Sequence, residues 1–161
     1  MWRVGILTAS DKGYRGERED RSGREIATLV TRIGGERIVH EVIPDEWAVI
    51  RRTLIRMCDQ EQVDLILTTG GTGFAPRDVT PEATRSVIER EVPGIPEAMR
   101  LASLEKTKFA VLSRSVAGIR GSTLIINLPG SPKAVRECLE AILDVLPHAL
   151  EILTERFGDH D

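Results

Sequence analysis

The sequence predicts an α/β fold, a single three-layer domain of residues 1–161 with a mostly parallel sheet flanked by helices. Three observations lead to this prediction. Apolar strand-like runs alternate with amphipathic helix-like segments, and parallel strands need such crossovers, which also cover both faces of the sheet. The length of 161 residues is close to the commonest size of one domain. No linker, repeat or low-complexity stretch divides the chain.

The first third of the chain predicts a strand, a loop and a helix. The apolar run Val4–Ala9 is typical of a buried strand, and a polar, glycine-containing loop follows it to residue 20. Ser22 with Glu25 three residues later has the spacing of a capping box, which predicts the start of a helix. Apolar residues continue at helical spacing until Gly34 ends the helix.

The middle third predicts two more strands around a helix. Residues 37–43 alternate in polarity and end before Pro44, which indicates a strand. Asp45 is expected to open a helix that buries one apolar face. Residues 63–68 are apolar on both faces, as expected of a central parallel strand.

The last part predicts helices that begin with a hydroxyl residue followed by proline. Thr80-Pro81 and Ser131-Pro132 both have this pattern. A short helix is expected over 95–103, and strands over 109–112 and 123–128 with a loop at 113–122 between them. Pro147 is expected to kink or break the final helix.

The overall charge and hydropathy exclude some classes of protein. A net charge of −3 and a pI near 5.7 argue against a nucleic-acid partner. No apolar run approaches the roughly 20 residues that cross a bilayer, and no signal-peptide pattern precedes the first strand. We therefore expect a cytoplasmic protein with no membrane association, in which Cys58 and Cys138 are small buried apolar residues.

In a parallel sheet, ligands bind beyond the carboxyl ends of the strands. The loops at residues 10–21, 69–78, 113–122 and 129–131 all follow predicted strands and are rich in glycine and polar residues. We therefore expect these four loops to meet at one edge of the sheet.

The loop at residues 69–78 contains the residues Gly70, Gly71, Thr72 and Gly73. Glycines let the backbone approach a ligand closely, and amide groups in such a loop bind anions. The sequence after Gly73 lacks the Lys-Ser or Lys-Thr of a P-loop, and Pro76 does not fit a dinucleotide fingerprint. A purely structural glycine turn is the alternative.

Two carboxylates are predicted to lie beside this loop. Asp78 closes it, and Asp45 opens a helix directly after the strand that ends at Ile43. Mg²⁺ is commonly held by one or two carboxylates together with substrate phosphates and water, so the pair is a candidate magnesium site. The alternatives are that Asp45 is a helix N-cap and Asp78 a turn residue.

Two further segments suit an anionic ligand. Residues 113–122 contain the candidate ligand-binding residues Ser113, Arg114, Gly121 and Ser122, and arginine binds phosphate through paired donors. Pro129 and Gly130 bring a helix N-terminus to the sheet edge, although an ordinary capped turn is the alternative. No arrangement of serine, cysteine or histidine indicates a protein nucleophile. The residues alone therefore predict Mg²⁺-dependent binding of phosphates.

At this point the motifs resemble those of a known family. The run TGGTGFAPRDVTPEAT at residues 69–84 resembles the signature of the MogA/MoaB family of molybdopterin-binding proteins. LSRSVAGIRGSTLIINLPGSPKAV at 112–135 resembles the adenylyltransferase branch of that family. TASD at 8–11, DRSG at 20–23 and IPDE at 43–46 also fit, so the likeness covers essentially the whole chain. Ser131 departs from the asparagine or glutamine expected in many relatives.

This resemblance implies the molybdopterin-binding fold, a homotrimer, and transfer of AMP from ATP to the terminal phosphate of molybdopterin with release of pyrophosphate. A partner enzyme that inserts molybdate would receive the product. By position, Asp45 and Asp78 match an essential acidic pair that holds Mg²⁺ and the triphosphate. Ser122 matches a residue at the pterin, residues 70–73 match a nucleotide-side loop, and Ser10 and Asp11 match a ligand-lining pair.

Two alternatives within this resemblance remain. One is a non-catalytic pterin-binding protein of the MoaB type, against which the intact pair of carboxylates argues. The other is the competence-damage-related or molybdate-inserting branch, against which the short chain argues.

Overall fold

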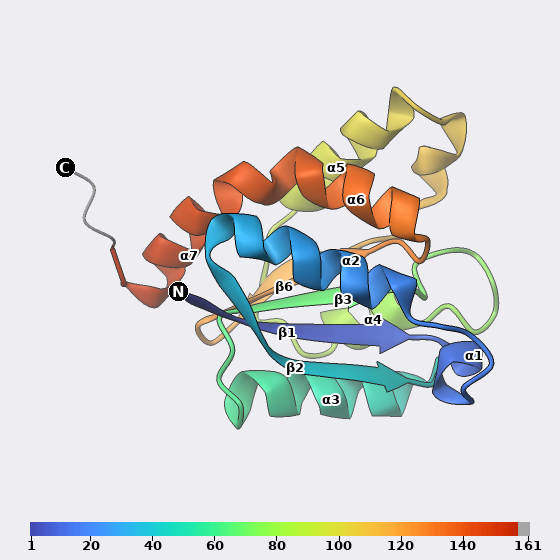
Figure 1. Cartoon of the computed structure of the whole chain (residues 1–161), viewed down its shortest axis with the longest axis horizontal. Helices are drawn as coiled ribbons and strands as arrows, with labels where there is room; N and C mark the ends of the chain where they lie inside the picture. Colours follow the sequence, from blue (N-terminus) through green and yellow to red (C-terminus); the bar gives the residue numbers. More distant parts are fainter. Residues whose placement is uncertain (158–161) are drawn as a thin grey trace.

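The computed structural model describes residues 1–157 and contains a six-stranded sheet with the strand order β2-β1-β3-β6-β5-β4 (Figure 1). The first four strands of this order are mutually parallel, β5 runs antiparallel to β6, and β4 runs antiparallel to β5. The strands are β1 (Trp2–Ala9), β2 (Gly35–Ile43), β3 (Leu65–Thr69), β4 (Arg90–Glu91), β5 (Ala117–Arg120) and β6 (Thr123–Leu128).

Helices cover both faces of the sheet and give three layers (Figure 1). The α-helices are α1 (Asp11–Tyr14), α2 (Arg21–Val30), α3 (Trp47–Asp59), α4 (Thr80–Arg85), α5 (Gly94–Leu104), α6 (Pro132–Ile142) and α7 (Leu146–Thr154); the 3₁₀ helices are η1 (Thr31–Ile33), η2 (Lys108–Leu112) and η3 (Leu143–Val145). One apolar core lies between the sheet and α2, α5, α6 and α7, and the other lies between the sheet and α3 and α4. The predicted α/β class and layering are confirmed.

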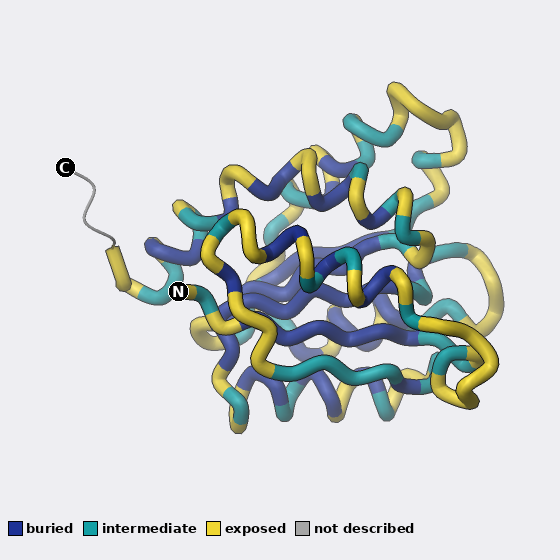
Figure 2. The backbone as a smooth tube through the Cα atoms, viewed as in Figure 1, coloured by how far each residue is buried: buried dark blue, intermediate teal, exposed yellow. Residues whose placement is uncertain are grey.

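Burial increases toward the centre of the sheet, as the apolar patterns predict (Figure 2). All five residues of β3 are buried, and β6 is buried along its whole length. The edge strand β2 is mostly half-buried or exposed. Strands buried on both faces are typical of parallel sheets covered by crossover helices.

Helix starts agree with the sequence in some cases and differ in others. Ser131 caps α6 as predicted, since its Oγ accepts a hydrogen bond from Ala134 N–H. The predicted capping box at Ser22 is wrong, because Asp20 is the N-cap of α2 and accepts from Gly23 N–H. Asp45 does not open α3, whose N-cap is Glu46. Thr80 begins α4 beside Pro81 but makes no capping hydrogen bond.

The prediction of a strand over residues 109–112 is wrong. These residues belong to η2, and Phe109, Val111 and Leu112 are exposed. A short apolar run does not distinguish a buried strand from an exposed turn of helix. The predicted loop at 113–122 contains β5, which pairs antiparallel with β6.

This hairpin changes where the second half of the predicted loop lies. Thr69 pairs with Leu128 at the carboxyl edge, so Thr123 begins β6 at the amino edge. Arg120 pairs with Thr123, and the turn at Gly121 and Ser122 is therefore also at the amino edge. The expectation that all of residues 113–122 lie at the carboxyl edge is wrong for this turn.

The C-terminal helices follow the sequence pattern. Pro147 lies in the first turn of α7, where its missing N–H costs no helical hydrogen bond, and η3 separates α6 from α7. Cys58 and Cys138 are free, buried thiols as expected. No helix within residues 1–157 is long and apolar enough to cross a bilayer.

Candidate functional site

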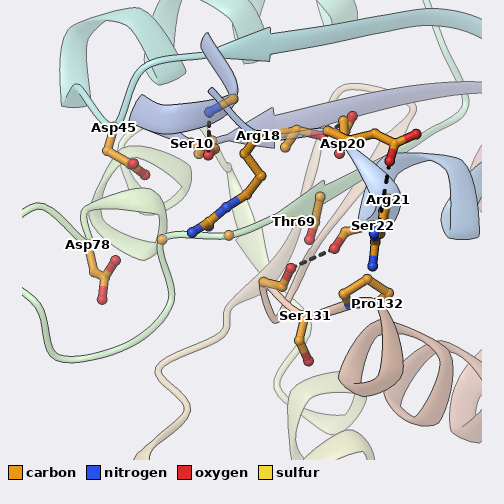
Figure 3. Close-up of a pocket in the computed structure, with 17 residues that line it drawn as sticks. Ser10, Arg18, Asp20, Arg21, Ser22, Asp45, Thr69, Asp78, Ser131 and Pro132 are labelled. Carbon is orange, nitrogen blue, oxygen red and sulfur yellow. Dashed lines mark hydrogen bonds and ion pairs between the residues drawn. The ribbon is translucent and has the colours of Figure 1, made fainter. Parts of the chain in front are cut away.

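A cavity of about 660 Å³ lies at the carboxyl edge of the sheet (Figure 3). The segments that follow β1, β3 and β6 line it, together with the N-termini of α2 and α6. Six predicted site residues line this cavity: Ser10, Asp45, Gly70, Gly71, Asp78 and Gly130. The topology thus brings together residues from four segments distant in the sequence.

Asp45 is held at this edge by reciprocal hydrogen bonds with Asp11 in α1. Its Oδ2 accepts from Asp11 N–H at 3.0 Å, and its own N–H donates to Asp11 Oδ1 at 2.9 Å. Burial and the nearby charges of Asp11 and Asp78 raise the pKa of Asp45, against the lowering effect of the Asp11 amide. A cation bound beside Asp45 would favour the ionised form of its side chain.

Asp78 lies at the same end of the cavity as Asp45 and belongs to the turn that closes the glycine loop (Figure 3). Its Oδ2 accepts from Ala75 N–H at 2.9 Å, so it has the turn role named as an alternative. A Cβ on Gly73 would lie 2.9 Å from the same oxygen, which shows how closely the loop passes the carboxylate. The side chain nonetheless lines the cavity, so the two roles coexist.

The glycine loop presents unpaired backbone donors. Gly70 and Gly71 have φ values of +91° and +72°, which glycine adopts without the strain of a side chain. Among the described residues, the N–H groups of Gly71, Thr72 and Gly73 make no hydrogen bond. Successive unpaired amides of this kind form an anion-binding concavity.

Arg114 holds this loop in place, although the sequence pattern predicts that it binds ligand. Its guanidinium donates to the carbonyl oxygens of Gly73 and Asp78 at 2.9 and 2.8 Å. It also pairs with Glu82 at 2.6 Å. With its donors used inside the protein, Arg114 shapes the loop and does not line the cavity.

The other end of the cavity contains cationic groups that the sequence pattern did not identify. Arg18, Arg21 and Ser22 line it, and the Arg18 side chain extends toward the space between the two carboxylates and Thr69 (Figure 3). Arg18 makes no hydrogen bond or ion pair with any residue that the structure describes. The DRSG motif at 20–23 is the signal that could have pointed to this region, because it belongs to the family pattern and has no other assigned role.

Asp20 anchors this end of the site. It accepts hydrogen bonds from Thr8 Oγ1 at 2.9 Å and Gly23 N–H at 2.9 Å, and it contacts His40 Nε2 at 2.7 Å. Burial raises the pKa of Asp20, but the hydrogen bonds from His40, Gly23 and Thr8 outweigh this effect and lower it. Asp20 is therefore an ionised cap that fixes the start of α2 at the cavity.

A second cavity of about 290 Å³ lies beside the first, between the glycine loop, α5, η2 and α6. Four predicted site residues line it: Thr72, Gly73, Ser113 and Pro129. Its other walls are largely apolar, with Met99, Phe109 and Leu112 among them. A mostly apolar cavity with a few hydroxyl groups suits a flat heterocyclic ligand.

Three predicted site residues lie elsewhere. Asp11 faces an outer hollow, where Arg77 donates to it at 2.7 and 2.9 Å. Gly121 and Ser122 are exposed in the hairpin turn at the opposite edge of the sheet. Within this chain they are separated from both cavities, because a hairpin reverses the direction of β5 relative to β6.

Asp45 and Asp78 fit a magnesium site in which the substrate would supply some of the metal ligands. Among residues 1–157, no group of three or more His, Cys, Asp or Glu side chains could hold a metal. Mg²⁺, however, often takes only one or two carboxylates and completes its shell with phosphate oxygens and water. Asp45 and Asp78 face one cavity, and the Coulombic effect of Asp78 on the pKa of Asp45 shows that they repel each other.

Comparison with known proteins supports the resemblance drawn from the motifs. Residues 5–148 match the family model described as a probable molybdopterin binding domain. A molybdopterin adenylyltransferase of Helicobacter pylori J99 is 45% identical over 93% of this chain and 86% of its own length. The molybdopterin adenylyltransferase of Escherichia coli K12 is 43% identical over 88% of this chain and 74% of its own length.

Solved structures give the same result. The molybdopterin biosynthesis enzyme MoaB of Thermus thermophilus is 57% identical to this chain and superposes with a TM-score of 0.92. The match covers 97% of this chain and 98% of that protein's chain. The Mog protein of Mycobacterium ulcerans is 38% identical, with a TM-score of 0.88, and covers 96% of this chain and 98% of its own.

Proposed function

This chain belongs to the family of probable molybdopterin binding domains, and from that premise we propose that it is a molybdopterin adenylyltransferase of molybdenum cofactor biosynthesis. It transfers AMP from ATP to the terminal phosphate of molybdopterin. The observation that carries the proposal is the meeting of Asp45, Asp78 and the unpaired amide of Gly71 at one cavity. The names of the two similar adenylyltransferases described above supply the substrate.

The two cavities suggest how the two substrates are arranged. The first cavity, with its two carboxylates, the unpaired amide of Gly71 and Arg18, suits a triphosphate with Mg²⁺. The second cavity, with Ser113 and apolar walls, suits the pterin. Thr72 and Gly73 lie on the side of the second cavity, whereas Gly70 and Gly71 lie on the side of the first. The glycine loop therefore separates the two ligands and places their phosphates near each other.

The reaction needs positioning more than a strong base. A phosphate oxygen of molybdopterin attacks the α-phosphorus of ATP, the new P–O bond forms, and the bond to pyrophosphate breaks. The attacking phosphate is already ionised at neutral pH, so charge neutralisation and alignment supply most of the rate. Asp45 and Asp78 would hold Mg²⁺, which would neutralise charge on the triphosphate, and the unpaired amides of residues 71–73 would orient the phosphates.

Self-association is the second part of the proposal. The C-terminal end of α5 and the segment that follows it project from the body of the fold (Figure 1), and α5 and η2 expose large apolar side chains: Leu101, Leu104, Phe109, Val111 and Leu112. Exposed apolar side chains gathered on neighbouring elements are typical of a protein interface. We propose that it forms part of a homotrimer in the cytoplasm, from which the adenylylated pterin passes to a molybdate-inserting enzyme. Light scattering that returned a monomer mass at micromolar concentration would contradict the trimer.

The activity is tested by incubating the purified protein with molybdopterin, ATP and Mg²⁺ and measuring pyrophosphate. We expect release that depends on all three components and stops in excess chelator. The alternative is a pterin-binding protein of the MoaB type. That alternative predicts quenching of the pterin fluorescence without any pyrophosphate.

A further inference from the structure

The hydroxyl of Thr80, the first residue of α4, has no hydrogen-bond partner within the part of the chain that the structure describes. The residue is fully buried, and its Oγ1 is sealed from solvent. Buried hydroxyls are nearly always hydrogen-bonded, because leaving one unpaired costs stability. Other buried threonines follow this rule: Thr53 donates to Val49 O at 2.8 Å, and Thr123 donates to Val63 O at 2.6 Å.

The unpaired hydroxyl lies directly beneath the glycine loop and beside the carboxylate site. A Cβ built on Gly71 would overlap Thr80 Oγ1 and would lie 3.4 Å from Asp45 Oδ1. The two oxygens therefore flank the same point of backbone. A single water bridges two oxygens up to roughly 5.6 Å apart, since each hydrogen bond measures about 2.8 Å. Thr80 Oγ1 and Asp45 Oδ1 are both so close to the Cβ position of Gly71 that their separation does not exceed this distance.

The loop is tethered on both sides of Gly71 but only weakly at Gly71 itself. Gly70 N–H donates to Leu128 O, and Arg114 N–H donates to Thr72 O at 3.0 Å. The carbonyl of Gly71 accepts one bond of 3.2 Å from Thr80 N–H, and its own N–H has no partner among the described residues. Gly71 has no side chain, so a small shift of its backbone between these tethers on binding a phosphate would suffice to expose Thr80 Oγ1 to the cavity.

We propose that Thr80 is a positioning residue of the metal and phosphate site. When Mg²⁺ and the triphosphate are bound, its hydroxyl donates a hydrogen bond to a water that also contacts the Asp45 carboxylate, and this fixes the carboxylate toward the metal. The hydroxyl of Thr80 is thus unpaired in the free protein and gains a hydrogen-bond partner only when Mg²⁺ and the triphosphate are bound. This inference rests on the proposed function, because it assumes that Asp45 holds a metal with a nucleotide.

The experiment compares Thr80→Val, which keeps the shape and removes the hydroxyl, with Thr80→Ser, which keeps the hydroxyl. The control is Thr53→Val, which removes a buried, paired hydroxyl remote from the site. Two quantities are measured for each variant in the full-length protein. They are the melting temperature without ligand and the affinity for ATP by calorimetry, with Mg²⁺ and with chelator in its place.

We expect Thr80→Val to melt at or above the wild-type temperature, because removal of an unpaired buried hydroxyl is neutral or stabilising. Its affinity for ATP with Mg²⁺ should fall about 3- to 10-fold, the effect of one lost hydrogen bond, while its affinity in chelator stays unchanged. Thr80→Ser should restore the Mg²⁺-dependent affinity. Thr53→Val should lower the melting temperature and leave both affinities unchanged.

Equal Mg²⁺-dependent affinity in Thr80→Val and wild type would overturn the role of Thr80 and leave the proposed function intact. A lowered melting temperature in Thr80→Val with unchanged affinity would show a structural hydroxyl and overturn it equally. If the wild type itself bound no ATP with Mg²⁺, the proposed function would fail and this inference with it.

Discussion

Two glycine-containing segments that the sequence predicts to bind a ligand lie at opposite edges of the sheet, and they differ in whether their polar groups are paired within the chain. At the amino edge, in the turn that joins β5 to β6, Arg120 donates to both carboxylate oxygens of Asp59, at 3.1 and 2.9 Å. Gly121 N–H donates to Glu89. Each charge there has a partner within the chain.

At the carboxyl edge the glycine loop leaves its donors and carboxylates available. The amides of residues 71–73 have no partner in the described chain. Asp45 and Asp78 repel each other, and burial contributes to the raised pKa of Asp45. The difference teaches that glycine and polar residues in a loop do not by themselves identify a binding site, whereas unpaired amides and repelling carboxylates beside a cavity point to one. Such groups cost stability in the free protein, and a ligand compensates for that cost.

The largest expected effect is a loss of activity when a carboxylate is removed at the carboxyl edge of the sheet but not at the amino edge. Asp78→Asn should lose about 10²- to 10³-fold in turnover, the usual effect of removing one electrostatic contact to a transition state. The variant should stay folded and still bind molybdopterin. The measurement is pyrophosphate release at saturating pterin, with Asp59→Asn as the matched control. Equal losses in both variants would remove the distinction between the edges.

The next prediction compares one glycine from each edge. Gly71→Ala forces a side chain into positive φ and against Thr80, so it should lower the free energy of unfolding by roughly 2–4 kcal/mol. Gly121 also has positive φ, +57°, but a Cβ there meets nothing within 4 Å. Gly121→Ala should therefore cost only about 1 kcal/mol. Urea denaturation gives both values, and a larger loss at Gly121 would contradict the packing described here.

A third prediction is that removing the charge of Asp45 and removing that of Asp59 change the melting temperature in opposite directions, at pH 7 with a chelator present. The pKa of Asp45 is raised in the folded protein, so its ionised form destabilises the fold once the pH exceeds that pKa. The pKa of Asp59 is lowered by Arg120, so its ionised form stabilises the fold, and this contribution is lost as the pH falls through the lowered pKa. Asp45→Asn should raise the melting temperature by roughly 1–3 °C, and Asp59→Asn should lower it by a similar amount. Near pH 3 both differences should shrink. Shifts of the same sign at pH 7 would be inconsistent with this account.

The smallest expected effect distinguishes two serines of one predicted loop. Ser113 lines the second cavity, so Ser113→Ala should weaken pterin binding by roughly 0.5–1.5 kcal/mol. Ser122 is exposed at the amino edge, so Ser122→Ala should change neither binding nor stability by more than about 0.5 kcal/mol. Titration of the pterin fluorescence measures both. A clear loss of affinity in Ser122→Ala would require Ser122 to reach a ligand on another subunit.

The sequence by itself determined the fold class, the central strands and the family. Period and burial patterns identify β3 and β6 because strands covered on both faces must be continuously apolar. The glycine loop and the two aspartates were also found from sequence, since parallel topology sends the ends of neighbouring strands to one edge. These are properties of local pattern and chain direction, which a sequence contains.

Only the tertiary structure decided which polar groups are free. The reversal of β5 puts Ser122 away from both cavities of this chain, and Arg114 donates to carbonyl oxygens of the glycine loop, although Ser122 and Arg114 lie in one motif. Arg18 lines the cavity, while Asp11 is paired with Arg77 outside it. Whether a charge serves a ligand or the fold depends on contacts between residues tens of positions apart. No local pattern specifies those contacts, because a side chain becomes available to a ligand only when the packed protein leaves it without a partner.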